Sequence, residues 1–272
     1  MIVAALIAPL LSFVSEPAQA VAPTCAQGGV CQVGDTGPGG GKVFYVAPDD
    51  GTFTQVGATD SMCSTDCKYL EAAPTTGGSA WTDASYVWSG DTGTGVGATG
   101  TAIGTGYENT KDIVTQSNTA DRAGTKSRAY RGPNSLSDWY LPSKDELNQL
   151  YLQRVTVGAS TTVGSSYLSS SESGANTMYF QSFTNGDSNS GVKSWVGHKV
   201  RPIRAFGLER APTKVAVTRA PVRTLTPNTV FASQPQITIQ DVNSRTVSSS
   251  AVVTATISAG GTFSWNNNGH RI

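Results

Sequence analysis

Ionisable side chains are scarce in this chain of 272 residues, of which only 14% are Asp, Glu, Lys or Arg and two are histidine. Nucleophilic catalysis needs a hydroxyl or thiol beside a base that a third group orients. His198 is the only histidine before the last few residues, and no G-x-S-x-G motif surrounds any of the serines. We therefore expect no enzyme active site.

Long hydrophobic runs are also lacking, since no apolar segment reaches the roughly 20 residues that a membrane-spanning helix needs. Residues 2–14 are apolar, and Ala18-Gln19-Ala20 provides the small-x-small pattern of a signal peptidase site. We predict that residues 1–20 are a signal peptide and that residues 21–33 are a linker. The protein is then secreted or lies at the cell surface.

Cysteine is rare, and the four cysteines of an exported chain indicate disulfides. The short spacings favour the pairs Cys25–Cys31 and Cys63–Cys67, and a bridge between the two loops is the alternative. We do not expect zinc, because no second Cys or His pair stands at zinc-finger spacing.

Two motifs resemble ligand sites but depart from them in detail. The glycine run Gly37 to Lys42 is followed by Val43, where a phosphate-binding loop requires Ser or Thr. Residues 185–189 alternate like calcium ligands, but Val196 stands at the position of the EF-hand glutamate, so a hairpin turn is the better interpretation. We expect no nucleotide, nucleic acid, metal or cofactor.

The chain does contain a series of short secondary-structure elements. Strands are predicted at residues 43–46, 167–173, 177–183 and 199–206, and another short element is predicted at 68–73. The predicted helices include residues 108–116 and 119–130. The clearest helix follows Ser143, which can form a capping box with Glu146 before the stripe of Leu147, Leu150 and Tyr151. Helices between strands predict an α+β domain.

A second domain is predicted after Ala211-Pro212, where the segments KVAVT, PQITIQD and AVVTATIS alternate apolar and polar residues. This pattern is typical of a bacterial immunoglobulin-like repeat. Such a sandwich needs about 100 residues. We therefore expect residues 212–272 to be an incomplete Ig-like domain.

Three segments carry a family resemblance: GDTGPGGGKVFY at 34–45, SDWYLPSKDELNQLY at 137–151 and VRPIRAF at 200–206. They resemble the extracellular domain at the C-terminus of the Legionella collagen-like adhesin, a domain family of unknown function. The second segment is also similar to the R-L-P-T-x-x-E-W segment of formylglycine-generating enzymes and C-type-lectin-like folds. The resemblance implies that residues 34–208 form a C-type-lectin-like mixed domain with two or three short helices and antiparallel strands. It implies no oxidase, because those enzymes use a later cysteine pair and no cysteine follows Cys67.

Aromatic and basic side chains indicate where a ligand would bind. Tryptophan can stack on a sugar face, and core anchoring is the alternative role for Trp81, Trp88 and Trp195. Charge is uneven, with 11 acidic and 3 basic residues in 21–121 against 6 acidic and 14 basic in 122–223. Either the second stretch offers a cationic surface, or the two stretches fold together and their charges interleave. The basic candidates for contact with an acidic polysaccharide are Lys193, Lys199, Arg128 and Arg131.

These patterns predict a non-catalytic binding or adhesion module for an extracellular glycan or matrix polymer. One alternative is a structural cap on a stalk of immunoglobulin-like repeats. The other is an enzyme on the lectin-like scaffold, for which Glu172, His198 and an arginine would have to cluster. We expect instead that Glu172 forms a structural ion pair with Arg201 or Arg204.

Overall fold

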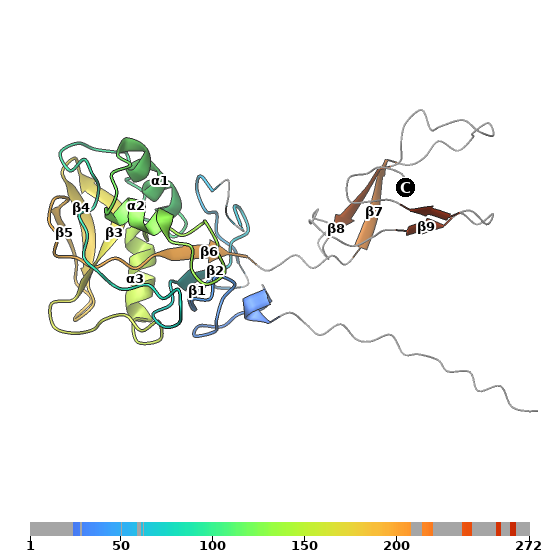
Figure 1. The fold of residues 1–272 in the computed structure, drawn as a ribbon, viewed down its shortest axis with the longest axis horizontal. Helices are drawn as coiled ribbons and strands as arrows, with labels where there is room; N and C mark the ends of the chain where they lie inside the picture. Colours follow the sequence, from blue (N-terminus) through green and yellow to red (C-terminus); the bar gives the residue numbers. More distant parts are fainter. Residues whose placement is uncertain are drawn as a thin grey trace, which may run out of the picture. The chain divides into compact units, whose positions relative to one another are not determined.

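The computed structural model describes most of the first 207 residues and four short strands beyond them (Figure 1). The described residues are 24–27, 29–49, 51–58, 61, 63–207, 214–219, 236–240, 254–256 and 262–264. The chain divides into two compact units, with the boundary between Phe206 and Gly207. The predicted signal peptide lies outside the described residues, and so does Ala211-Pro212. Within the described ranges, no helix combines the length and the apolar character that a membrane span requires.

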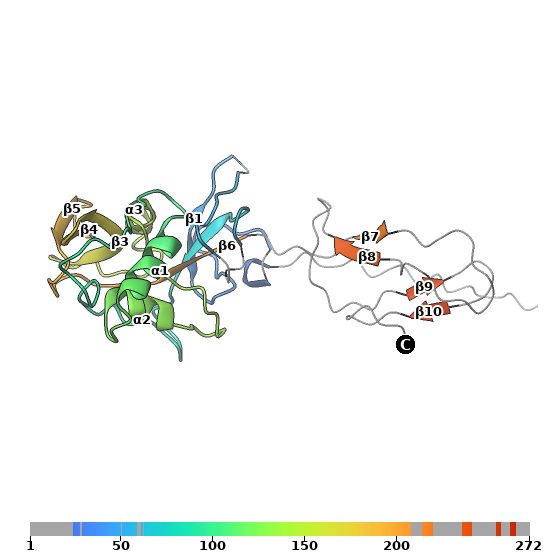
Figure 2. The ribbon, with the colours of Figure 1, turned by 90° about the horizontal axis from the view of Figure 1, so that it is seen from above.

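The first unit mixes helices with antiparallel sheets and is α+β, as predicted (Figures 1 and 2). Its elements, after a 3-10 helix at Cys25–Gln27, are β1 (Lys42–Val46), β2 (Tyr69–Ala72), α1 (Gly106–Gln116), α2 (Ala123–Ala129), α3 (Lys144–Leu152), β3 (Ser166–Gly174), β4 (Thr177–Ser182), β5 (Ser188–Val192) and β6 (Ile203–Phe206). The structure confirms the predicted elements, except that the second helix and the last strand are shorter than predicted and that β5 was not predicted.

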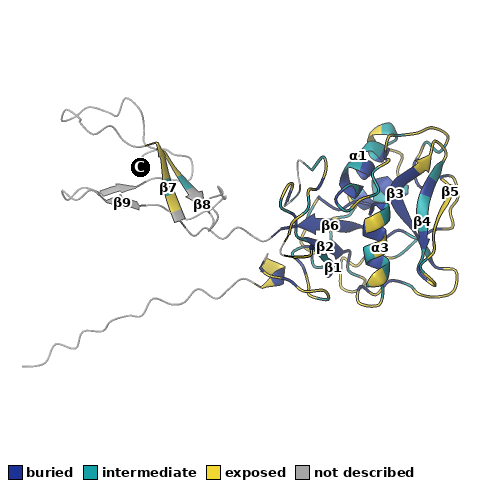
Figure 3. Cartoon of the chain, turned by 180° about the vertical axis from the view of Figure 1, so that it is seen from behind, coloured by how far each residue is buried: buried dark blue, intermediate teal, exposed yellow. Residues whose placement is uncertain are grey.

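The central sheet has the strand order β1-β2-β6, and all its pairs are antiparallel. Every residue of β2 and β6 is buried, which Figure 3 shows as two dark strands. Neighbouring residues on a strand point to opposite faces, so complete burial means that both faces are covered. The register places Arg204 directly opposite Glu71, which brings a cation and a carboxylate together inside the unit.

Helix α3 begins with the predicted capping box. The Ser143 hydroxyl accepts from the Glu146 amide at 3.3 Å, and the Glu146 carboxylate accepts from the Ser143 amide at 2.8 Å. Leu147 and Leu150 are buried, and Tyr151 is half-buried, so the predicted stripe faces the core. The helix packs against β1, β3 and β4, and joins the two sheets of the unit.

The second sheet has the order β3-β4-β5, and β5 is its exposed edge (Figure 3). Strand β3 is buried from Tyr167 to Glu172, whereas β5 is mostly exposed. The β4–β5 hairpin turns through residues 183–187, and the Asn185 amide donates to Asp187 within it. This is the hairpin turn that the sequence predicts in place of a calcium loop.

Both disulfides that the spacing favours are present. Cys25 is bonded to Cys31 and Cys63 to Cys67, so the alternative bridge between the two loops is wrong. All four cysteines are buried.

The second unit contains two antiparallel strand pairs within its described residues. Strand β7 (Lys214–Arg219) pairs with β8 (Gln236–Gln240), and β9 (Thr254–Thr256) pairs with β10 (Thr262–Ser264). The segments predicted to be strands after residue 212 thus contain β7, β8 and β9.

Candidate functional site

The glycine run is a loop around a buried carboxylate, that of Glu71. The amides of Gly39 and Gly41 donate to it at 2.7 and 3.1 Å. A side chain at Gly39 would lie 2.7 Å from both Glu71 and the ring of Trp139, so only glycine fits there. The amides of this loop therefore bind the carboxylate of Glu71, in the way that the amides of a phosphate-binding loop bind a phosphate.

Arg204 completes this network from the neighbouring strand. Its guanidinium donates to Glu71 at 2.5 Å and to both oxygens of Asp138 at 2.8 Å. Burial raises the pKa of Glu71, although Arg204 and the glycine amides act to lower it. Gly39, Asp138 and Arg204 come one from each segment of family resemblance. Those segments therefore meet in the interior and build the scaffold.

A second buried network surrounds Arg201, which is 1% exposed. Its guanidinium binds Asp83 through two nitrogens, at 2.6 and 2.5 Å, and Tyr167 donates to the same carboxylate at 2.6 Å. Burial and the Asp83 charge raise the pKa of the Tyr167 hydroxyl. Glu71 and Asp83 of the first stretch thus pair with Arg204 and Arg201 of the second, so the charges of the two stretches interleave at these buried pairs.

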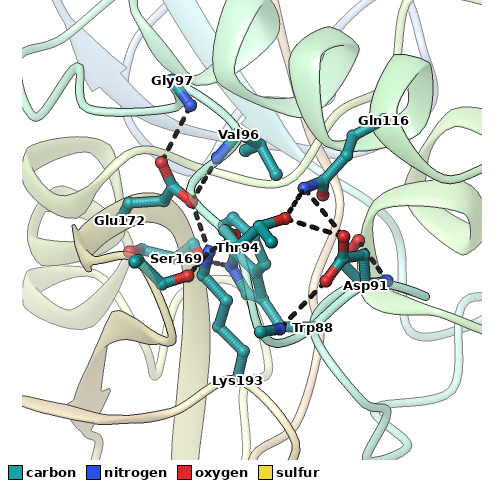
Figure 4. A network of polar contacts seen from close by, with 12 residues as sticks. Trp88, Asp91, Thr94, Val96, Gly97, Gln116, Ser169, Glu172 and Lys193 are labelled. Carbon is teal, nitrogen blue, oxygen red and sulfur yellow. Dashed lines mark hydrogen bonds and ion pairs between the residues drawn. The ribbon is translucent and has the colours of Figure 1, made fainter.

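The third network ties the segment after β5 to the core (Figure 4). The Lys193 ammonium donates to Glu172 and to the carbonyls of Thr94 and Ala175, at 2.9 and 2.7 Å. It also lies 4.6 Å from the centre of the Trp88 ring. The expected pairing of Glu172 with Arg201 or Arg204 is therefore wrong, because those arginines have other carboxylates.

Two further donors hold the Glu172 carboxylate in place. The amides of Val96 and Gly97 donate to it at 2.8 and 3.0 Å, from the loop that Figure 4 shows above it. With Lys193, these contacts occupy three of the about four lone-pair sites of the carboxylate.

Several of the predicted contact residues lie in the interior. Trp88 and Lys193 are fully buried and Trp81 is 9% exposed, so these three are not available to a ligand at the surface. The indole nitrogens of Trp81 and Trp88 donate to the carbonyls of Val200 and Ser169, at 2.7 and 2.8 Å. For both tryptophans, core anchoring is the role that the structure supports.

The other basic candidates do not gather with Lys193 on one cationic face. Arg128 is half-buried and lies 4.7 Å from the centre of the Tyr107 ring. Arg131 is exposed, and it donates to the carbonyls of Arg128 and Tyr130. Lys199 is half-buried and donates to Ser165 at 3.3 Å.

Of the three predicted tryptophan contacts, Trp195 is the one that remains at the surface, with 54% of its area exposed. It lies in the segment 193–198, which we name the Trp195 loop. The side chains of Val192 and Val196 are exposed beside it. Val192 is the last residue of the edge strand β5, so these exposed apolar side chains lie at the end of that strand and directly after it in the chain.

Both ends of the Trp195 loop are fixed by buried side chains. At one end, Lys193 is held by the network of Figure 4. At the other end, His198 stacks on Phe180 with ring centroids 3.9 Å apart, and its Nδ1 lies 2.6 Å from the Ser166 hydroxyl. A large aromatic side chain is therefore presented to solvent from a rigid support. Sequence reasoning missed this anchoring, because Lys193 and His198 are polar residues in a segment that looks like a loop.

His198 itself is 1% exposed, and burial lowers its pKa to about 4. The ring is therefore neutral at pH 7. Its Nε2 atom has no hydrogen-bond partner among the described residues. In the same part of the chain, no three metal-ligating side chains gather as a metal site would require.

A scan against protein-family models finds no match for this chain, and a search of curated proteins finds none. The function must therefore be inferred from the side chains of the chain itself.

Proposed function

We propose that this protein is a secreted or cell-surface binding module that recognises a glycan or matrix polymer through Trp195 and its loop. The observation that carries the proposal is an exposed tryptophan on a loop whose two ends are fixed in the core. Rigid aromatic side chains provide a large contact area at a small cost in conformational entropy. The family resemblance to an adhesin domain, and a C-type-lectin-like arrangement of the first unit, would agree with this role.

The geometry around Ser166 and His198 supports a non-catalytic role. A serine is activated when a neighbouring base is itself oriented by a third group at its other ring nitrogen. Here Nδ1 faces the serine, and Nε2 has no partner among the described residues. A histidine whose pKa is about 4 is also a weak base. Glu172, which would have to join them, is held by Lys193 instead.

An extracellular location is part of the proposal. Two disulfides are compatible with an oxidising compartment.

A glycan array probed with the full chain and with the Trp195→Ala variant tests the proposed function. We expect the wild-type chain to bind at least one class of glycan, and the variant to lose most of the signal. Val163→Ala is the matched control, because Val163 is 94% exposed and lies outside the Trp195 loop. Absence of binding to any glycan or matrix polymer would contradict the proposal.

A second candidate function is a cap on a stalk of immunoglobulin-like repeats. The antiparallel strand pairs of the second unit favour it, since they are the elements of a β-sandwich. In this case Trp195→Ala would leave every binding measurement unchanged, and the chain would act as a spacer.

A further inference from the structure

His198 holds a buried nitrogen that the protein leaves without a partner. Its Nδ1 lies 2.6 Å from the Ser166 hydroxyl, but Nε2 accepts from and donates to no described group. An unpaired polar atom in the interior is unfavourable, because it has lost its hydrogen bonds to water and gained none in the protein. A ligand that supplies the missing hydrogen bond would recover this free energy when it binds.

The unpaired nitrogen faces the one residue of β5 that has no side chain. A Cβ atom at Gly191 would lie 3.8 Å from His198 Nε2 and 3.1 Å from the ring of Phe180. Trp195 stands beside them, with its ring 4.5 Å from that of His198 and inclined at 76°. The His198 ring is therefore in contact with the rings of Phe180 and Trp195, and its Nε2 lies near the backbone of Gly191.

The three residues around His198, which are Phe180, Gly191 and Trp195, carry no charge. Between residues 188 and 197 the only ionisable side chain is Lys193, which is buried and paired with Glu172. Sulfate and carboxylate groups bind best to cations that can form charge-assisted hydrogen bonds. An acidic sugar would therefore find no such cation in this segment, whereas a neutral sugar needs none.

We propose that Trp195, His198 and Gly191 form a subsite for one ring of a neutral glycan, which stacks on Trp195 and places a hydroxyl at His198 Nε2. This inference rests on the proposed function and names the class of ligand. A hydroxyl suits the site whichever ring nitrogen of His198 carries the proton, because it can either donate to Nε2 or accept from it. An apolar wall with a single polar group is the usual composition of a small-molecule site.

Nε2 is buried in the free protein, so binding at this subsite requires a neighbouring side chain to shift, and Trp195 is the exposed ring that lies against His198. The shift is measurable by fluorescence. Of the tryptophans in the described part of the chain, Trp195 is the exposed one, and Trp81, Trp88 and Trp139 are buried. A bound sugar should therefore change the emission and the accessibility to a soluble quencher of the Trp195 indole.

The test is a titration of the full chain with neutral hexasaccharides and with heparin, followed by calorimetry and tryptophan fluorescence. Cellohexaose, mannohexaose and chitohexaose serve as the neutral probes. We expect at least one neutral probe to bind and to protect Trp195 from the quencher. We expect heparin not to compete.

Three variants separate the parts of the subsite. Trp195→Ala removes the stacking surface, and His198→Phe removes the nitrogen while it keeps an aromatic ring on Phe180. Gly191→Ala retains the Trp195 and His198 side chains and adds a methyl group 3.8 Å from Nε2 and 3.1 Å from the Phe180 ring. Each should weaken binding of the neutral probe by about tenfold or more, which is the loss of one well-placed contact. Gly78→Ala is the control, because a Cβ there meets no atom within 4 Å.

The outcomes distinguish the subsite from the proposed function. If heparin binds in a salt-dependent way and no neutral probe does, the subsite is wrong but the binding function stands. If a neutral probe binds and Gly191→Ala binds it as tightly as the wild type, the sugar lies elsewhere and the subsite is again wrong. If Trp195→Ala only converts a dimer to a monomer, the surface joins two copies, which also overturns the subsite. Should His198→Phe fail to fold, Gly191→Ala and Trp195→Ala decide.

Discussion

Replacement of Lys193 by methionine should destabilise the first unit by about 4 kcal/mol, although only a terminal amine is removed. The Lys193 ammonium donates to the Glu172 carboxylate and to two backbone carbonyls. Methionine fills a similar volume, but it cannot donate a hydrogen bond. The variant therefore leaves a carboxylate in the interior without its counter-ion.

The magnitude follows from the partners that remain. Removal of one member of a buried ion pair costs about 3–5 kcal/mol, because the other charge stays buried. Glu172 keeps the amides of Val96 and Gly97, at 2.8 and 3.0 Å, which places the loss near the lower limit. Loss of the contact between the ammonium and the Trp88 ring, 4.6 Å away, adds about 1 kcal/mol. The sum is a large part of the free energy of unfolding of a typical domain, which is about 5–15 kcal/mol.

Urea unfolding at pH 7, followed by circular dichroism, measures this loss as a shift of the midpoint at constant slope. Lys111→Met is the matched control, because Lys111 forms a surface pair with Glu108, and such a pair contributes less than about 1 kcal/mol. The double variant Lys193→Met with Glu172→Gln should recover about 2 kcal/mol, since no charge is then left unpaired. A loss below about 1 kcal/mol for Lys193→Met, or a double variant no more stable than the single one, would refute the reasoning.

Further predictions concern the scaffold. Gly39→Ala would place a methyl group 2.7 Å from the carboxylate and the indole that it faces, and should cost about 1–3 kcal/mol, whereas Gly78→Ala should have no measurable effect in the same urea assay. Substitution of both Cys63 and Cys67 by alanine should cost about 2 kcal/mol, and a reductant should then no longer lower the midpoint through this bridge. Burial raises the pKa of Glu146 from 4.5 to about 7, so its contribution to stability is present below pH 4.5 and is lost as the pH rises through 7. Over that interval the wild type should lose about 3 kcal/mol relative to Glu146→Gln, and identical pH profiles would contradict the assignment.

Local signals in the sequence predicted the local parts of the fold. The capping box of Ser143 and Glu146 involves residues three apart, so the helix start could be located from spacing alone. The same holds for Cys63 and Cys67, whose separation of four residues favours the observed pair. The short periodicity of residues 167–173 likewise located β3.

The spacing of residues in the sequence could not predict which residues pair over long distances in the chain. Arg204 pairs with Glu71, which lies 133 positions away in the sequence. The residues next to Arg204 and next to Glu71 give no sign of this pairing. Strand β5 was missed because Ser, Asn and Gly have low β-propensity, and only its pairing with β4 makes it a strand. The sequence left two roles open for Trp88, a sugar contact or a core anchor, and its ring lies in the core against the buried Lys193.

The segments that resemble a known domain and the residues that face solvent have different tasks in this chain. The glycine loop and Arg204 both donate to Glu71, and Arg204 also donates to Asp138. These hydrogen bonds are made inside the protein and do not hold a ligand. Trp195 lies outside all three segments of resemblance, on a loop that the core holds at both ends. A resemblance carried by buried residues can therefore indicate a scaffold without indicating its ligand. If binding is found, the contacts that decide specificity should map to the exposed residues of the Trp195 loop and of β5, where substitutions can change the ligand without disturbing the buried ion pair of Lys193 and Glu172.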